Sequence, residues 1–167
     1  LRNALKRDEM RLFYQPKFDV KSGRLSGAEA LLRWQHPARG LVGPQEFIPM
    51  AEESGLIVPL GDWVLQAACN QIKAWQSAGL ATPRIAVNVS SHQFREHRLA
   101  ETVRRALEAS GVDPQLLTLE ITESVIMENA QQNLDELSQI KLTGVKLSID
   151  DFGTGYSSLS YLMRFPL

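Results

Sequence analysis

Two adjacent carboxylates, Asp150 and Asp151, stand at the end of an apolar run that is typical of a buried strand. A turn rich in glycine and serine follows at once, over residues 152–159. Neighbouring carboxylates repel each other unless a proton or a cation lies between them. Hard divalent cations such as Mg²⁺ and Mn²⁺ prefer such oxygen ligands. The pattern therefore indicates a metal-assisted active site at a strand end.

Other oxygen-bearing side chains recur at the ends of the apolar runs that precede this one. Asn88 comes 32 residues before Glu120, and Glu120 comes 30 residues before Asp150. Glu29 lies in an apolar setting as well, where a lone carboxylate would be costly to bury unpaired. Together with Asp151, these positions give five oxygen-bearing groups from four strands that could converge on one cation site.

Each of these residues also has a purely structural interpretation. Asn88 could serve as a helix N-cap, and residues 122–124 could form a capping arrangement at the next helix. Glu120 could be an ordinary carboxylate at a sheet edge. Arg33, at the end of its strand, is either a surface cation or a phosphate clamp, since a guanidinium group matches phosphate bidentately.

The elements that must position these groups follow from hydrophobic periodicity and turn residues. The segments 11–20 and 25–34 are expected to form an antiparallel hairpin, and from residue 84 onward strands and helices alternate. Strands are expected at 11–20, 25–34, 84–89, 116–121 and 145–149, helices at 1–9, 44–54, 59–78, 99–109, 129–142 and 157–163, and a loop at 36–43. Alternation of this kind is typical of parallel βα units, whose ligands bind at the carboxyl ends of the strands.

Composition limits the classes of function that remain. The 167 residues are 44% hydrophobic, which suffices for the core of one domain. A net charge of −1 argues against DNA or RNA as a partner. No apolar run reaches the roughly 18–20 residues of a membrane span, so no membrane contact is expected. The single Cys69 forms no internal disulfide, and we expect a cytoplasmic domain.

Ordered sequence blocks resemble one known family along the whole chain, the EAL-domain family of bacterial cyclic di-GMP phosphodiesterases. The family takes its name from the triplet that stands here as Glu29-Ala30-Leu31. The matching blocks are Tyr14-Gln15-Pro16, Glu29 through Trp34, Pro44 through Pro49, Asn88-Val89-Ser90, Leu119 through Ser124 and Asp150 through Leu159.

The resemblance implies an α/β fold, a TIM-like (β/α)8 barrel whose first strand runs antiparallel. Such a barrel typically needs about 250 residues. Residues 1–167 would then be the N-terminal portion of a single EAL domain, with about five strands. We expect this portion alone not to hydrolyse substrate.

The resemblance also implies roles for individual residues. Glu29, Asn88, Glu120 and Asp150 would ligate one Mg²⁺ or Mn²⁺, and Asp150 with Asp151 would help to hold a second. Asp150, Asp151 and Glu123 would form the catalytic group, with Glu123 anchoring the loop after Asp151. For the substrate, Arg33 would bind a phosphate and Gln15 would lie near a guanine.

The implied reaction is hydrolysis of one phosphodiester bond of cyclic di-GMP to linear pGpG, in bacterial second-messenger signalling. A homodimer and flanking sensory or GGDEF-type domains in the parent protein are further expectations. The alternative is a receptor module that binds cyclic di-GMP without cleaving it. Outside the family, a metal-dependent TIM-barrel enzyme such as an enolase-like lyase would be a more distant possibility.

Overall fold

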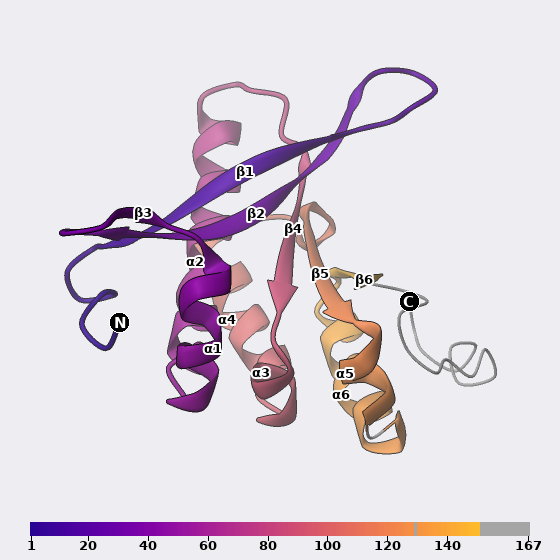
Figure 1. Cartoon of the computed structure of the whole chain (residues 1–167). Helices are drawn as coiled ribbons and strands as arrows, with labels where there is room; N and C mark the ends of the chain where they lie inside the picture. Colours follow the sequence, from indigo (N-terminus) through magenta and orange to yellow (C-terminus); the bar gives the residue numbers. More distant parts are fainter. Residues whose placement is uncertain (129, 151–167) are drawn as a thin grey trace.

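The structure, a computed structural model, describes residues 1–128 and 130–150 and contains one mixed sheet. Its strands are β1 (Met10–Phe18), β2 (Leu25–His36), β3 (Gly40–Val42), β4 (Arg84–Val89), β5 (Leu117–Thr122) and β6 (Lys146–Asp150). The main order is β1-β2-β4-β5-β6, with β3 paired to β2. Strand β1 is antiparallel to β2, whereas β2, β4, β5 and β6 pair in parallel. Figure 1 shows β1 and β2 as one long hairpin, with β2 next to β4.

Helices connect the parallel strands, as the alternating pattern predicts. They are α1 (Pro44–Glu53), α2 (Ile57–Ser77), α3 (Ser91–Arg95), α4 (Leu99–Ser110), α5 (Glu123–Glu128) and α6 (Ala130–Leu142), with a short 3-10 turn at Pro114–Leu116. Pro44 occupies the first turn of α1, where its missing N–H costs nothing. The α/β class with an antiparallel first strand is confirmed, and the strand path has the expected five members.

Three local expectations differ from the structure. Residues 2–8 form turns where a helix was expected over 1–9, and the expected loop at 36–43 contains β3. The short helices α3 and α5 were not expected. A capping box explains α3, because Ser90 Oγ accepts from the backbone of Gln93 while the Gln93 side chain accepts from the backbone of Ser90. The helix expected at 157–163 lies outside the described residues.

Alternate side chains of the parallel strands face opposite sides of the sheet. One side packs under the helices, and its members in β4 and β5 are almost fully buried: Ile85, Val87, Val89, Leu117, Leu119 and Ile121. They join a core with Leu65, Ile72 and Val103 from α2 and α4. The other side of these strands is the open face of the sheet, and its side chains in β4 and β5 are polar except for Ala86.

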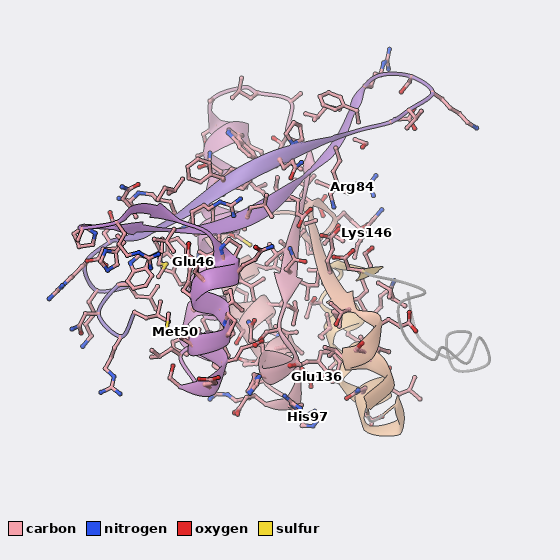
Figure 2. All side chains as sticks on the ribbon, viewed as in Figure 1. Glu46, Met50, Arg84, His97, Glu136 and Lys146 are labelled. Carbon is pink, nitrogen blue, oxygen red and sulfur yellow. The ribbon has the colours of Figure 1, made fainter. Side chains whose placement is uncertain are left out.

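Helix α4 receives its N-terminal cap from another helix. Its own N-cap residue, Arg98, makes no side-chain cap, and the buried carboxylate of Glu136 on α6 accepts from the backbone N–H of Ala100 at 3.2 Å. His97 Nδ1 lies 3.9 Å from the same carboxylate, and Figure 2 shows the two side chains at one end of the helical layer. A carboxylate at this place stabilises the helix through both hydrogen bonding and the helix dipole.

This cap gives a stability prediction. Glu136→Ala should lower the free energy of unfolding by about 1–2 kcal/mol, because the Ala100 N–H loses its acceptor in a buried place. Urea unfolding followed by circular dichroism measures the change. The control is Asp135→Ala, which removes an exposed carboxylate from the adjacent position and should change the value by less than about 0.5 kcal/mol. Equal effects of the two substitutions would contradict the cap.

Candidate functional site

The open face gathers the oxygen-bearing residues because neighbouring strands are aligned in register. Asn88 of β4 pairs with Glu120 of β5, and Glu120 pairs with Ser148 of β6. Asp150 lies two residues beyond Ser148, on the same face. On the other flank, Glu29 of β2 pairs with a residue two positions before Asn88. The structure thus places all four predicted side chains on one face of the sheet, with Asn88, Glu120 and Asp150 in the carboxyl-terminal halves of their strands.

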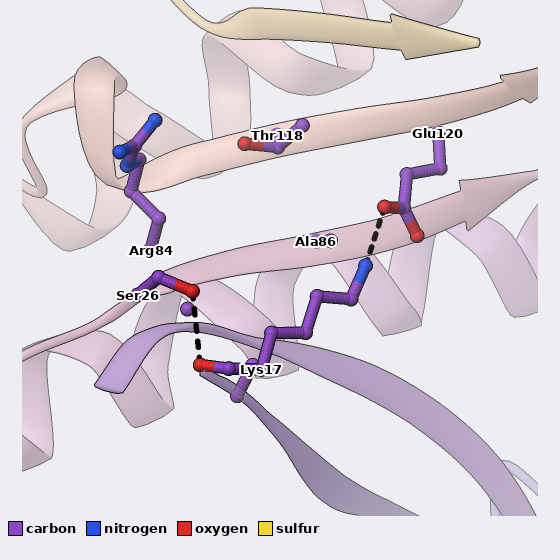
Figure 3. A pocket seen from close by; sticks show the side chains of 8 residues that line it. Lys17, Ser26, Arg84, Ala86, Thr118 and Glu120 are labelled. Atoms are coloured by element: carbon purple, nitrogen blue, oxygen red, sulfur yellow. Dashed lines mark hydrogen bonds and ion pairs between the residues drawn. The ribbon is translucent and has the colours of Figure 1, made fainter. Parts of the chain in front are cut away.

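Direct contacts join three of these residues and a lysine that the motif analysis did not identify. Asn88 Nδ2 donates to Glu29 Oε1 at 2.8 Å. Lys17 of β1 donates from Nζ to Glu120 Oε1 at 2.6 Å, and the same Nζ lies 3.7 Å from Glu29 Oε2. Figure 3 shows the Lys17 side chain reaching across the sheet toward Glu120. One ammonium group therefore bridges two carboxylates that come from different strands.

Three carboxylates, those of Glu120, Glu29 and Asp150, act on the single ammonium group of Lys17. Burial on its own lowers the pKa of Lys17, but the hydrogen bond to Glu120 and the charges of Glu120, Glu29 and Asp150 together raise that pKa above its usual value. The side chains of Glu29 and Glu120 are only 25% and 12% exposed. A cation at this place is therefore attracted by carboxylates that water screens incompletely.

The oxygen ligands that the structure describes at this place are few, but they suit a hard divalent cation. Two carboxylates and the Oδ1 atom of Asn88 are oxygen ligands of the kind that Mg²⁺ and Mn²⁺ prefer. Within residues 1–128 and 130–150, no three Asp, Glu, His or Cys side chains lie close enough together to hold a metal by themselves. Asp151, the predicted ligand for a second metal, lies outside these ranges.

The remaining predicted residues border the same face. Gln15 of β1 pairs with Glu29, and Arg33 follows Glu29 by four residues along β2. Arg33 Nη1 donates to the backbone carbonyl of Leu32 at 2.8 Å, and its side chain is half-buried. Glu123 is the first residue of α5, directly after β5, and is 2% exposed. Gln15, Arg33 and Glu123 thus lie on β1, on β2 and directly after β5, the strands that carry Lys17, Glu29 and Glu120.

A hollow of about 220 Å³ continues the open face toward the amino ends of the strands. Figure 3 shows Arg84, Thr118 and Ser26 along it, with Lys17 and Glu120 at the end nearest the carboxylate cluster. The Ser26 hydroxyl donates to the backbone carbonyl of Lys17 at 3.0 Å, which fixes this part of the hairpin.

Lys17 is the member of this cluster that the pattern of oxygen ligands in the sequence does not predict. A signal for it was present in the sequence, because Lys17 follows Gln15 by two residues in a strand and therefore lies on the same face. Its partner Glu120 is 103 residues away in the chain, so only the sheet order reveals the contact.

Comparison with protein families finds one model, the EAL domain, which matches residues 1–167. Among curated proteins, the chain is 50% identical over 166 residues to the bifunctional diguanylate cyclase/cyclic di-GMP phosphodiesterase MucR of Pseudomonas aeruginosa. It is 46% identical over 167 residues to the cyclic di-GMP phosphodiesterase NbdA of the same organism. These alignments cover 99% and 100% of the chain but only 24% and 21% of the two proteins. The chain thus spans about a fifth to a quarter of the length of these relatives.

Solved structures share the fold. A structure described as the PaMucR phosphodiesterase in complex with c-di-GMP matches with a TM-score of 0.94 and 50% identity, over 99% of this chain and 67% of that chain. The EAL enzyme Bd1971, in a form with cAMP and cyclic di-GMP bound, matches with a TM-score of 0.87 and 33% identity, over 99% of this chain and 46% of that chain.

Proposed function

Since the chain belongs to the EAL-domain family, we propose that it is part of a metal-dependent phosphodiesterase that hydrolyses cyclic di-GMP to linear pGpG. Two similar proteins, MucR and NbdA, carry this activity in their names, and the similar MucR structure is a complex with c-di-GMP. The family match extends from residue 1 to residue 167. We propose that these residues are the N-terminal portion of one EAL domain.

The observation that carries the proposal is the cation-binding cluster on the open face. Glu29, Asn88 and Glu120 lie within a network of contacts at 2.6–3.7 Å around one positive group, and the charge of Asp150 acts on the same group. We assign the first metal to these four residues and the second to Asp150 with Asp151. When bound, the divalent cations would lower the pKa of a water molecule and stabilise the negative charge that develops on the phosphoryl oxygens in the transition state.

The residues of the chain bind and orient the substrate in this proposal. Arg33 and Glu29 are four residues apart on one strand, a separation of about 13 Å between their backbones. Arg33 can therefore hold one phosphate through its guanidinium fork without occupying the cation cluster. Gln15, on the neighbouring strand, would contact a guanine. Glu123 would hold the loop after Asp151 in place.

Three further features belong to the proposal. Flanking sensory or GGDEF-type domains fit the greater length of the curated relatives, one of which is named as a bifunctional cyclase and phosphodiesterase. We also propose a homodimer. Cys69, the single cysteine of the sequence, is free and buried, which is compatible with the proposed cytoplasmic location. No helix among the described residues is both long and apolar enough to span a membrane.

Metal binding is the first test. Glu120→Gln in the complete protein should weaken Mn²⁺ binding at least about tenfold, because it replaces a charged oxygen ligand by a neutral amide. Isothermal titration with MnCl₂ measures the affinity. Glu108→Gln, which neutralises an exposed glutamate of α4, is the matched control and should leave the affinity unchanged. Unchanged Mn²⁺ affinity in the Glu120 variant would contradict the metal assignment.

Hydrolysis is the second test. In the complete protein, Glu29→Gln and Asp150→Asn should each lower kcat by about a thousandfold or more, since each removes a charge that holds the catalytic cations. Chromatography of cyclic di-GMP and pGpG follows the reaction, with Glu108→Gln again as control.

Glu123→Ala should retain metal binding and lose less activity than the Glu29 and Asp150 variants. Full activity of the Asp150 variant would refute the assignment, and wild-type protein that binds cyclic di-GMP in EDTA but never cleaves it with Mn²⁺ would support a receptor.

A further inference from the structure

Lys17 occupies the place between the carboxylates where a shared divalent cation would bind. Its Nζ atom is 2.6 Å from Glu120 Oε1 and 3.7 Å from Glu29 Oε2. We propose that Lys17 is a built-in competitor of the metal, which holds these two carboxylates together in the metal-free protein and is displaced when the metal binds. This inference rests on the proposed function and adds a positioning residue to it.

The distances set the two cations in competition. A Mg²⁺ or Mn²⁺ ion lies about 2.1 Å from a ligating oxygen. An ion bound to Glu120 Oε1 would therefore be less than about 5 Å from Lys17 Nζ in its present position, which is itself 2.6 Å from that oxygen. Two positive centres so close together repel each other, and water screens this repulsion only in part beside the mostly shielded Glu29 and Glu120. The lysine and a metal therefore compete for the same oxygen, Glu120 Oε1.

The side chain of Lys17 has room to move away from the two carboxylates. Its side chain is 43% exposed, and it reaches the carboxylates on a flexible four-carbon stem from β1. The hollow of about 220 Å³ beside it, which Thr118 and Ala86 line, offers space on the same open face (Figure 3). Displacement then requires a change of side-chain rotamer and leaves the hydrogen-bonded register of β1 and β2 intact.

In the metal-free protein, the lysine also maintains the geometry of the site. Without a cation, Glu29 and Glu120 would repel each other and turn away. Lys17 offsets one of the two negative charges, while Asn88 holds the other oxygen of Glu29 at 2.8 Å. The carboxylates therefore stay near ligating positions, and the metal must overcome the ammonium group to reach them. The expected consequence is a weaker apparent affinity for the metal than the carboxylates alone would give.

The test compares Mn²⁺ binding by wild type, Lys17→Met and Lys17→Arg in the complete protein. Electron paramagnetic resonance of free Mn²⁺ measures the dissociation constant. Lys17→Met keeps the aliphatic stem, removes the charge and should bind Mn²⁺ about tenfold more tightly. Lys17→Arg keeps a cation and should stay within about threefold of wild type. Lys21→Met, in the exposed turn of the hairpin, is the matched control and should bind as wild type does.

A second measurement uses thermal unfolding. Without metal, Lys17→Met should unfold at a lower temperature than wild type, because its two carboxylates are then uncompensated. Saturating Mn²⁺ should remove most of this difference, whereas a residue with a purely structural role would leave the difference in place at every metal concentration.

The outcomes separate this inference from the proposed function. Wild type that binds Mn²⁺ combined with a Lys17→Met variant that binds no more tightly overturns the competition alone. The same holds if Lys17→Met only raises KM for cyclic di-GMP, because the lysine would then act on the substrate. Absence of Mn²⁺ binding in both wild type and variant overturns the proposed function together with the competition.

Discussion

The alternation of side chains along strands aligned in register is the constraint on which the site depends. Asn88, Glu120 and Ser148 lie side by side because β4, β5 and β6 share one register, and the residues between them along each strand are buried under the helices. A slip of one residue in β5 would turn Leu119 to the open face and Glu120 into the core. The free energy gained by burying Leu117, Leu119 and Ile121 therefore also fixes the direction of Glu120.

Grouping carboxylates on that face has an electrostatic cost that local contacts offset. Glu29 and Glu120 are mostly shielded from water, where like charges repel more strongly than at an exposed surface. The amide of Asn88 donates a hydrogen bond to Glu29, and the ammonium of Lys17 donates one to Glu120. The same two contacts explain how a cluster suited to a divalent cation can exist in a stable fold before that cation arrives.

The sequence predicted the long elements and the side of the sheet on which the oxygen ligands lie. The strand predicted at 84–89 has those bounds in the structure, and the others shift by one or two residues. Such predictions rest on the periodic spacing of apolar residues over six or more positions. It fails for β3 and α3, which are too short for a periodic signal, and for the cap of α4 by Glu136, which comes from a separate helix. Lys17 was missed for a related reason, since its partner lies on a distant strand.

The contact between Lys17 and Glu120 also bears on the order of events in folding. It joins residues 103 positions apart, across a path that runs through β2 and β4. Closing so long a loop early is entropically unfavourable, and non-local pairings form slowly. The hairpin of β1 and β2 is local, so it can form while the chain is still being synthesised, with Lys17 already in place on it. The carboxylate of Glu120 arrives only after β5 has left the ribosome and joined the sheet. In the nascent chain, Lys17 is therefore in place on the hairpin well before the carboxylate of Glu120 is available to bind it or a metal cation.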